Sequence, residues 1–139
     1  MIVPAVYNES PEDGVPFMSP AELMHAIDTQ LAHVWMVRAF LKHSEEAAED
    51  EELAEVHREL YDYMLALGGP LKEQNAEDYL KLARKKFARL KRATELFCQI
   101  QPEVSQHTNF FMAAASLRVA VAEIGRLLET EGQRDGGTE

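Results

Sequence analysis

The distribution of glycine and proline constrains this chain more than any other feature of its sequence. Glycine is absent between Gly14 and Gly68 and again between Gly69 and Gly125, and the prolines lie at positions 4, 11, 16, 20, 70 and 102. Each of these residues breaks or weakens a helix interior, so long intervals without them are what helices require. The chain therefore has room for several long helices.

Capping signals and apolar spacing indicate where these helices begin and end. Ser19-Pro20-Ala21-Glu22 combines a capping serine, a proline suited to the first turn and a glutamate three residues after the serine. Apolar residues then recur at spacings of three and four, the period of a helix that buries one face. The sequence predicts helices over about 20–48, 52–67, 76–100 and 104–131, the second ending at Gly68-Gly69-Pro70.

Four long helices with short connections favour an all-α, up-down-up-down four-helix bundle over residues 19–131. We expect an extended N-terminal arm over residues 1–18 and a short disordered tail over residues 132–139. The predicted core positions are Leu23, Ile27, Val34, Leu41, Leu53, Val56, Leu60, Met64, Leu67, Leu80, Ala83, Phe87, Leu90, Thr94, Phe97, Phe110, Leu117, Val121, Ile124 and Leu128.

Composition narrows the environment and the partners. The 139 residues are 46% hydrophobic and 27% charged, proportions typical of one globular domain. A net charge of −10 argues against general binding to nucleic acids or anionic membranes, since both repel it. The single cysteine excludes an intrachain disulfide, and neither a membrane-length apolar stretch nor a secretory signal is present. We expect a cytoplasmic protein with no membrane partner.

Charge is concentrated in two blocks. Residues 45–55 contain seven acids and no base, whereas residues 81–92 contain seven of the fourteen bases and no acid. One interpretation is that the blocks are solvated faces that attract each other within the bundle or across an oligomer. The other makes the basic block an anion-binding or nucleic-acid-binding stripe. The first is favoured, because no aromatic residues interleave with the bases on the same face.

The first helix is apolar on more than its core face. At about 100° per residue, Met36 and Phe40 lie nearly opposite the core stripe and Trp35 lies on its flank. A helix that is apolar on several sides is buried on several sides. We therefore predict a non-enzymatic interaction or scaffold module, either a homodimer or a complex with another helical protein. The predicted interface residues, from the first and last helices, are Trp35, Met36, Phe40, Phe111, Met112 and Val119.

A metal-binding or small-ligand-binding bundle is the alternative hypothesis. In an antiparallel bundle His57, Cys98 and His107 reach a similar level, and imidazole with thiol suits zinc or another divalent transition metal. Single histidines and a single cysteine are also ordinary packing residues in bundles. A di-iron centre needs two Glu-x-x-His pairs. The chain has one, Glu22 with His25.

Arg38-Ala39-Phe40-Leu41-Lys42-His43 resembles the Arg-x4-His pattern of HEPN-type ribonucleases, which are helical bundles of similar size that often work as dimers. The resemblance implies an arginine that holds a phosphate and a histidine that moves a proton from the attacking 2′-hydroxyl. The chain departs from the pattern at Ala39, where that family commonly has a polar residue. A packing role also suits Arg38, whose stem would lie at the edge of the core while its head pairs with a carboxylate.

Overall fold

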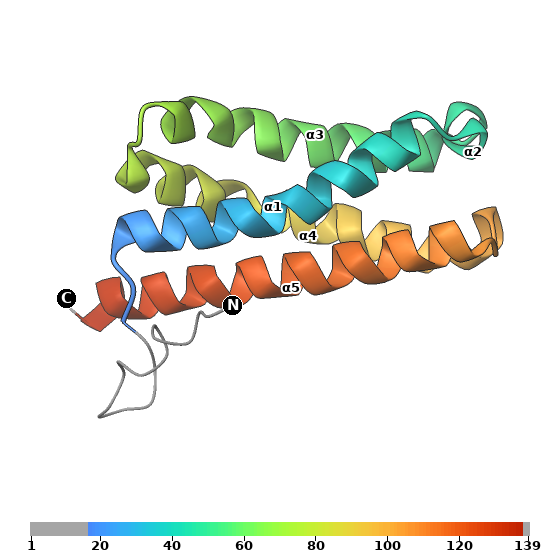
Figure 1. Ribbon diagram of the computed structural model, residues 1–139. Coiled ribbons are helices and arrows are strands. Elements are labelled where there is room, and N and C mark those ends of the chain that lie inside the picture. The colour runs from blue at the N-terminus through green and yellow to red at the C-terminus, as the bar shows by residue number, and fades with distance from the viewer. Residues whose placement is uncertain (1–16, 138–139) are drawn as a thin grey trace, which may run out of the picture.

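The computed structural model describes residues 17–137, with side chains described through residue 130. Its helices are α1 (Pro20–Lys42), α2 (Glu45–Glu49), α3 (Glu51–Lys72), α4 (Ala76–Val104) and α5 (Thr108–Gly137), and no strand occurs among the described residues. The four long helices form the predicted up-down-up-down bundle, in which α1 packs between α3 and α5 and α4 packs between the same two helices behind it (Figure 1).

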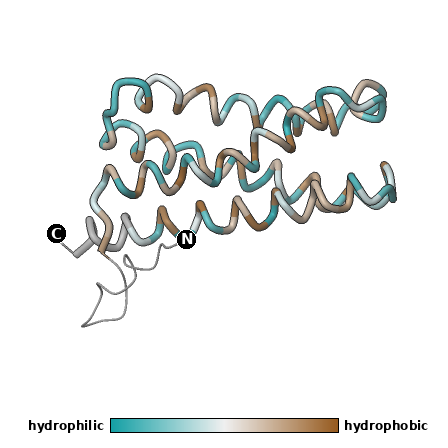
Figure 2. Tube along the Cα trace, in the orientation of Figure 1, coloured by the Kyte–Doolittle hydropathy of each residue, from teal (hydrophilic) through white to brown (hydrophobic). Residues whose placement is uncertain are grey.

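The core residues predicted from the helical spacing are confirmed. Of the twenty predicted core positions, all are buried except Met64 and Phe87, which are partly buried and pack against the core. Each long helix carries hydrophobic residues at intervals along its length, whereas α2 and the turn between α3 and α4 are mainly hydrophilic (Figure 2). None of the described helices combines the length and the apolar character needed to cross a bilayer.

The capping box at the start of α1 is confirmed. The Ser19 hydroxyl oxygen accepts a hydrogen bond from the Glu22 backbone N–H at 3.1 Å, and a Glu22 carboxylate oxygen accepts one from the Ser19 N–H at 2.9 Å. Together these bonds satisfy two of the backbone donors that a helix N-terminus leaves free.

The first helix ends earlier than the sequence predicts. It stops at Lys42 rather than near residue 48, and the short helix α2 precedes α3. Ser44 causes the break, since its hydroxyl donates to the Leu41 carbonyl at 2.9 Å and accepts from the Ala47 N–H at 3.1 Å. Asp50 then caps α3 by accepting from the Leu53 N–H at 2.9 Å. Both side chains offer the backbone an alternative to a continuous helix.

The second predicted end is also wrong, because α3 continues through Gly68, Gly69 and Pro70 to Lys72. Glycine costs only about 1 kcal/mol in a helix interior. Leu71, which lies beyond these residues, packs against the core and favours the extra turn. The helix ends where Gln74 takes a positive φ of 55°.

Proline is similarly tolerated near the end of α4. This helix passes Pro102 and ends at Val104 rather than at residue 100, and Val104 packs against the core. The last helix begins at Thr108 instead of 104 and extends to Gly137 instead of 131. Residues 1–16 of the predicted arm (1–18) and residues 138–139 of the predicted tail (132–139) lie outside the described residues, whereas residues 132–137, predicted to be disordered, belong to α5.

Candidate functional site

The predicted interface residues are mostly exposed, although they fall on three different parts of the surface. The exposed fractions are 46% for Trp35, 65% for Met36, 59% for Phe111, 56% for Met112 and 60% for Val119. Isolated apolar residues at a surface are ordinary, so the arrangement of these side chains matters more than their number.

Phe40 is a packing residue of the bundle. It is partly buried, and its ring centroid lies 4.9 Å from that of the buried Phe110 with an interplanar angle of 66°. This edge-to-face geometry is favourable for aromatic pairs. Phe40 therefore joins α1 to α5 within one chain.

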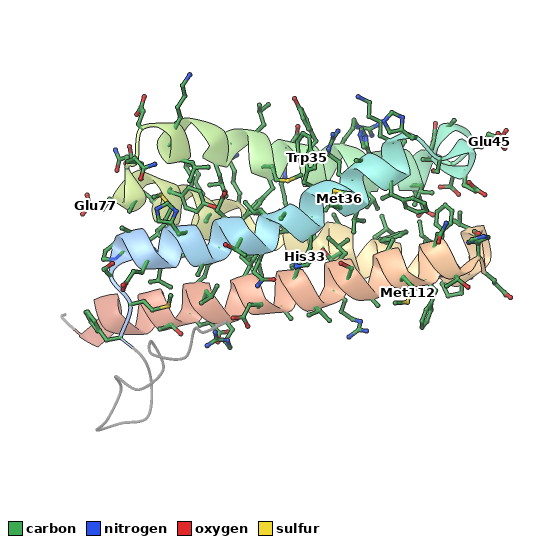
Figure 3. All side chains as sticks on the ribbon, in the orientation of Figure 1. His33, Trp35, Met36, Glu45, Glu77 and Met112 are labelled. Atoms are coloured by element: carbon green, nitrogen blue, oxygen red, sulfur yellow. The ribbon has the colours of Figure 1, made fainter. Side chains whose placement is uncertain are left out.

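Met112 and Val119 border a shallow groove between α1 and α5. The groove has a volume of about 320 Å³, and its walls also include Gln30, His33 and Ala115. Figure 3 shows His33 between the two helices and Met36 on the neighbouring outer side of α1. A projecting methionine therefore lies beside a hollow that small residues leave open.

Phe111 belongs to a separate groove, although it is the neighbour of Met112 in the sequence. It lies with Gln101, Pro102, Gln106 and Thr108 at the connection between α4 and α5. Adjacent residues of a helix point about 100° apart, which directs Phe111 toward α4 and Met112 toward α1. The structure thus separates two residues that the sequence analysis placed in one interface.

Acidic residues are missing from the part of the surface around the α1–α5 groove. The chain contains 24 acids, yet none occurs in residues 29–44 or in residues 104–122. These segments supply the central and C-terminal parts of α1 and the first half of α5. Carboxylates keep most of an acidic protein's surface hydrated, whereas the surface here carries methionine, valine and alanine side chains together with the uncharged polar Gln30 and Ser116 and with His33.

Trp35 lies on the other side of α1, toward α3, where it covers Arg38 (Figure 3). The Arg38 guanidinium carbon lies 4.1 Å from the Trp35 ring centroid and 5.1 Å from that of Tyr61. Arg38 is only 8% exposed, and its Nε has no hydrogen-bond partner. No carboxylate of the described chain lies within 4.0 Å of it, so the expected ion pair is replaced by two aromatic faces.

His57 completes this cluster from α3. Its Nε2 lies 3.4 Å from an Arg38 guanidinium nitrogen. Burial lowers the pKa of His57 below its ordinary value, and the positive charges of Arg38, Lys42 and Arg58 lower it further. A neutral imidazole can accept a hydrogen bond from Arg38, whereas an imidazolium would repel it.

The structure does not bring together the proposed metal ligands His57, Cys98 and His107. The Cys98 thiol faces the Ala114 carbonyl at 3.8 Å, and the His107 Nδ1 accepts from the Asn109 N–H at 3.0 Å. Burial also raises the pKa of Cys98 and favours the thiol over the metal-binding thiolate. Among the described side chains, no three His, Cys, Asp or Glu residues are placed to hold a metal ion.

The pairing implied by the ribonuclease resemblance is not assembled either. The histidine that contacts Arg38 is His57 of α3, whereas His43 is the exposed C-terminal cap of α1. A phosphate could approach Arg38 only after Trp35 or Tyr61 moved away. In the Glu-x-x-His pair, Glu22 with His25, the Glu22 carboxylate accepts a hydrogen bond from the Ser19 N–H of the capping box.

Two exposed apolar residues of α3 were missed by the sequence analysis. Tyr61 is 38% exposed and Leu65 is 62% exposed, and both lie outside the core stripe of their helix. Met36 was predicted as an interface residue because it lies off the core stripe of α1. The same criterion applied to α3 would have identified Tyr61 and Leu65. Tyr61 in addition contacts α1 through Arg38, which no sequence pattern indicated.

The α1–α5 groove has a mixed lining. Met112, Ala115, Val119 and Ala120 make most of its walls apolar, and Gln30, His33 and Ser116 add polar groups. No protein-family model, curated protein or solved structure matches this chain, so its function must be argued from its own residues.

Proposed function

We propose that the protein is a non-enzymatic helical interaction module that self-associates through one face of the bundle. This face, called here the α1–α5 face, consists of Met36, Met112 and Val119 together with the groove that Met112 and Val119 border. The observation that carries the proposal is the coincidence of exposed apolar side chains with acid-free segments in a chain of net charge −10.

A second copy of the chain is the partner that this face fits. Two copies of net charge −10 repel each other, and the repulsion is weakest where neither presents carboxylates. A basic partner would instead be attracted to the acidic parts of the surface. An acid-free apolar face therefore favours association with a like-charged molecule.

The shape of the face suits a two-fold contact. In such a contact the same patch of each copy meets its equivalent, so a projection and a matching hollow must both be present on it. Met36 projects from α1, and the groove beside it has a volume of about 320 Å³. Met36 of each copy would enter the groove of the other.

The side of the bundle on which this face lies is large enough for such a contact. A standard interface covers about 800 Å² on each partner. The 23 residues of α1 form a rod about 35 Å long, and a neighbouring helix lies about 10 Å away. Two such helices side by side present about the required area, which is roughly a tenth of the 8775 Å² that the chain exposes.

The experiment compares oligomeric states by sedimentation equilibrium and native mass spectrometry. In about 500 mM salt, which screens contacts between exposed charges, wild type is expected to be a dimer, whereas Met36→Glu and Val119→Glu are expected to be monomers because they bury a charge in an apolar contact. Phe111→Glu is the matched control: it lies on the same helix as Val119 and is equally exposed, but outside the face. It should remain dimeric.

Monomeric wild type at every concentration tested would overturn the proposal, and so would equal dissociation of all three variants. Far-UV circular dichroism on each variant separates dissociation from unfolding. Substitutions at exposed positions are expected to change monomer stability by no more than about 0.5 kcal/mol.

A reducing, cytoplasmic environment is part of this proposal. The chain has one cysteine, whose partly buried thiol is directed at a backbone carbonyl of α5. A protein that depends on no disulfide is suited to a compartment in which thiols stay reduced.

A further inference from the structure

Helix α4 presents a row of cations on the opposite side of the bundle from the α1–α5 face. Lys81, Lys85 and Arg92 follow one line along its outer surface at helical spacings, and Lys91 lies beside them. All four side chains are exposed. We call these four residues the α4 basic stripe.

Within one chain the acidic block reaches the stripe at Arg92, which lines a groove between α3 and α4 together with Glu55 and Glu59. Arg89 and Glu59 lie 4.0 Å apart, which sets the antiparallel register of α3 against α4. In this register residues 81–91 lie beside the part of α3 that follows the acidic block, and Arg92 lies near its last residue, Glu55. The four stripe residues make no ion pair with any described side chain.

The stripe is short and has acidic boundaries. Glu77 and Asp78 precede it and Glu95 follows it on the same helix. From Lys81 to Arg92 the helix rises about 17 Å, so a long polyanion such as a nucleic acid would have to cross carboxylates at both ends. The only residue between the cations on the outer line is Ala88, which cannot stack on a base. The stripe fits a short acidic protein segment.

The chain itself contains a segment of this kind. Residues 45–55, called here the acidic end, hold seven acids in α2 and the first turns of α3. They lie at the end of the bundle marked by Glu45, opposite the end marked by Glu77 at the start of α4 (Figure 3). The caps at Ser44 and Asp50 hold the acidic end in a defined shape, so it can dock without being ordered first.

We propose that the acidic end of one copy docks on the α4 basic stripe of another copy. The two surfaces differ, so the contact is head-to-tail and does not close on itself as a two-fold contact does. It goes beyond the proposed function, because it uses neither α1 nor the groove beside α5. Salt should weaken it strongly, since the charges are exposed and the Debye length is only about 10 Å at 0.1 M salt.

The test uses two charge reversals in a Met36→Glu background, which removes any contribution of the α1–α5 face. One variant reverses the stripe by Lys85→Glu and Arg92→Glu. The other reverses the acidic end by Glu49→Lys and Glu52→Lys, two exposed positions. The control, Lys72→Glu with Arg118→Glu, makes the same change in net charge as the stripe reversal, at exposed cations outside the stripe.

Sedimentation velocity is measured in about 50 mM and about 500 mM salt, which shorten the Debye length from roughly 14 to roughly 4 Å. The Met36→Glu protein and the control should associate with increasing concentration in low salt and weaken at least about tenfold in high salt. Each reversal alone should remove most of this association. An equimolar mixture of the two reversals should form a complex of one copy of each, since the unchanged acidic end of the first variant can dock on the unchanged stripe of the second.

A Met36→Glu protein that stays monomeric in low salt would overturn the proposal, as would a mixture of the reversals that forms no complex. Circular dichroism on each variant shows that it is folded before it is mixed. Wild type that is monomeric in high salt would rule out the α1–α5 face as an interface. The association of the Met36→Glu protein in low salt would still test the contact between the acidic end and the α4 basic stripe.

Discussion

The guanidinium carbon of Arg38 lies 4.1 Å from the ring centroid of Trp35, so the only tryptophan of the chain covers a buried cation. Tyr61 approaches the same cation from α3. The three side chains join α1 to α3 through the attraction between a cation and aromatic faces rather than through an ion pair. The emission of Trp35 consequently reports on the α1–α3 contact.

Replacing Arg38 by methionine should change the free energy of unfolding by no more than about 1 kcal/mol, because a buried charge without a carboxylate partner contributes little net stability. Arg38→Ala should cost about 2 kcal/mol or more, since it also removes the packing of the stem. Urea unfolding followed by circular dichroism measures both. A methionine variant as unstable as the alanine variant would show that the charge itself is required.

Acidification should destabilise the fold through His57. Its pKa is lower in the folded state than in the unfolded chain, so the folded state binds fewer protons below the ordinary histidine pKa of about 6.5. Stability should therefore fall as the pH decreases from about 7.5 to about 5, and His57→Gln should reduce this dependence. Urea midpoints across this range provide the measurement. The control His25→Gln, at an exposed position of α1, should keep the wild-type slope.

Removing the hydroxyl of Tyr63 should cost about 1 kcal/mol, because this buried group donates a 2.9 Å hydrogen bond to the Ala83 carbonyl and links α3 to α4. Burial also raises the pKa of Tyr63, so the hydroxyl remains a donor at any physiological pH. Tyr61→Phe, two residues away, keeps the ring face that contacts Arg38 and should cost less than about 0.5 kcal/mol. Equal losses in the two thermal melts would contradict this assignment.

Two glycines in helices should respond differently to alanine. At Gly68 an added Cβ would meet no atom within 4 Å, so Gly68→Ala should stabilise the protein by about 0.5–1 kcal/mol through helix propensity. At Gly125 the Cβ would lie 2.9 Å from the Phe87 ring, which would have to move. We expect Gly125→Ala to be about 1 kcal/mol less stable than Gly68→Ala. Identical urea midpoints for the two variants would show that the ring moves at no cost.

The core was predictable from the sequence because one local rule determines it. The spacing of residues such as Leu23, Ile27 and Leu41 follows the helical period, and burial follows the spacing. Helix ends were predicted less well because competing local effects decide them. Ser44 broke a segment with no glycine or proline, whereas Pro70 failed to end α3 because Leu71 packs on the core.

The candidate surface was only partly predictable, since it depends on which helices become neighbours. Angular position correctly selected Met36, Met112 and Val119 as lying off the core stripe. It could not show that Phe40 packs on Phe110 or that Phe111 turns toward α4. Those outcomes are set by the packing of α1 and α4 against α5, which a single helix cannot reveal.

Helices α1 and α4 lie diagonally across the bundle, with α3 and α5 between them (Figure 1). If both proposed contacts form, the four-helix body acts as a spacer about two helix diameters thick, roughly 20 Å, between a neighbour bound at α1 and a neighbour bound on the outer side of α4. Each copy would then hold more than one neighbour at the same time, on separate sides of the bundle.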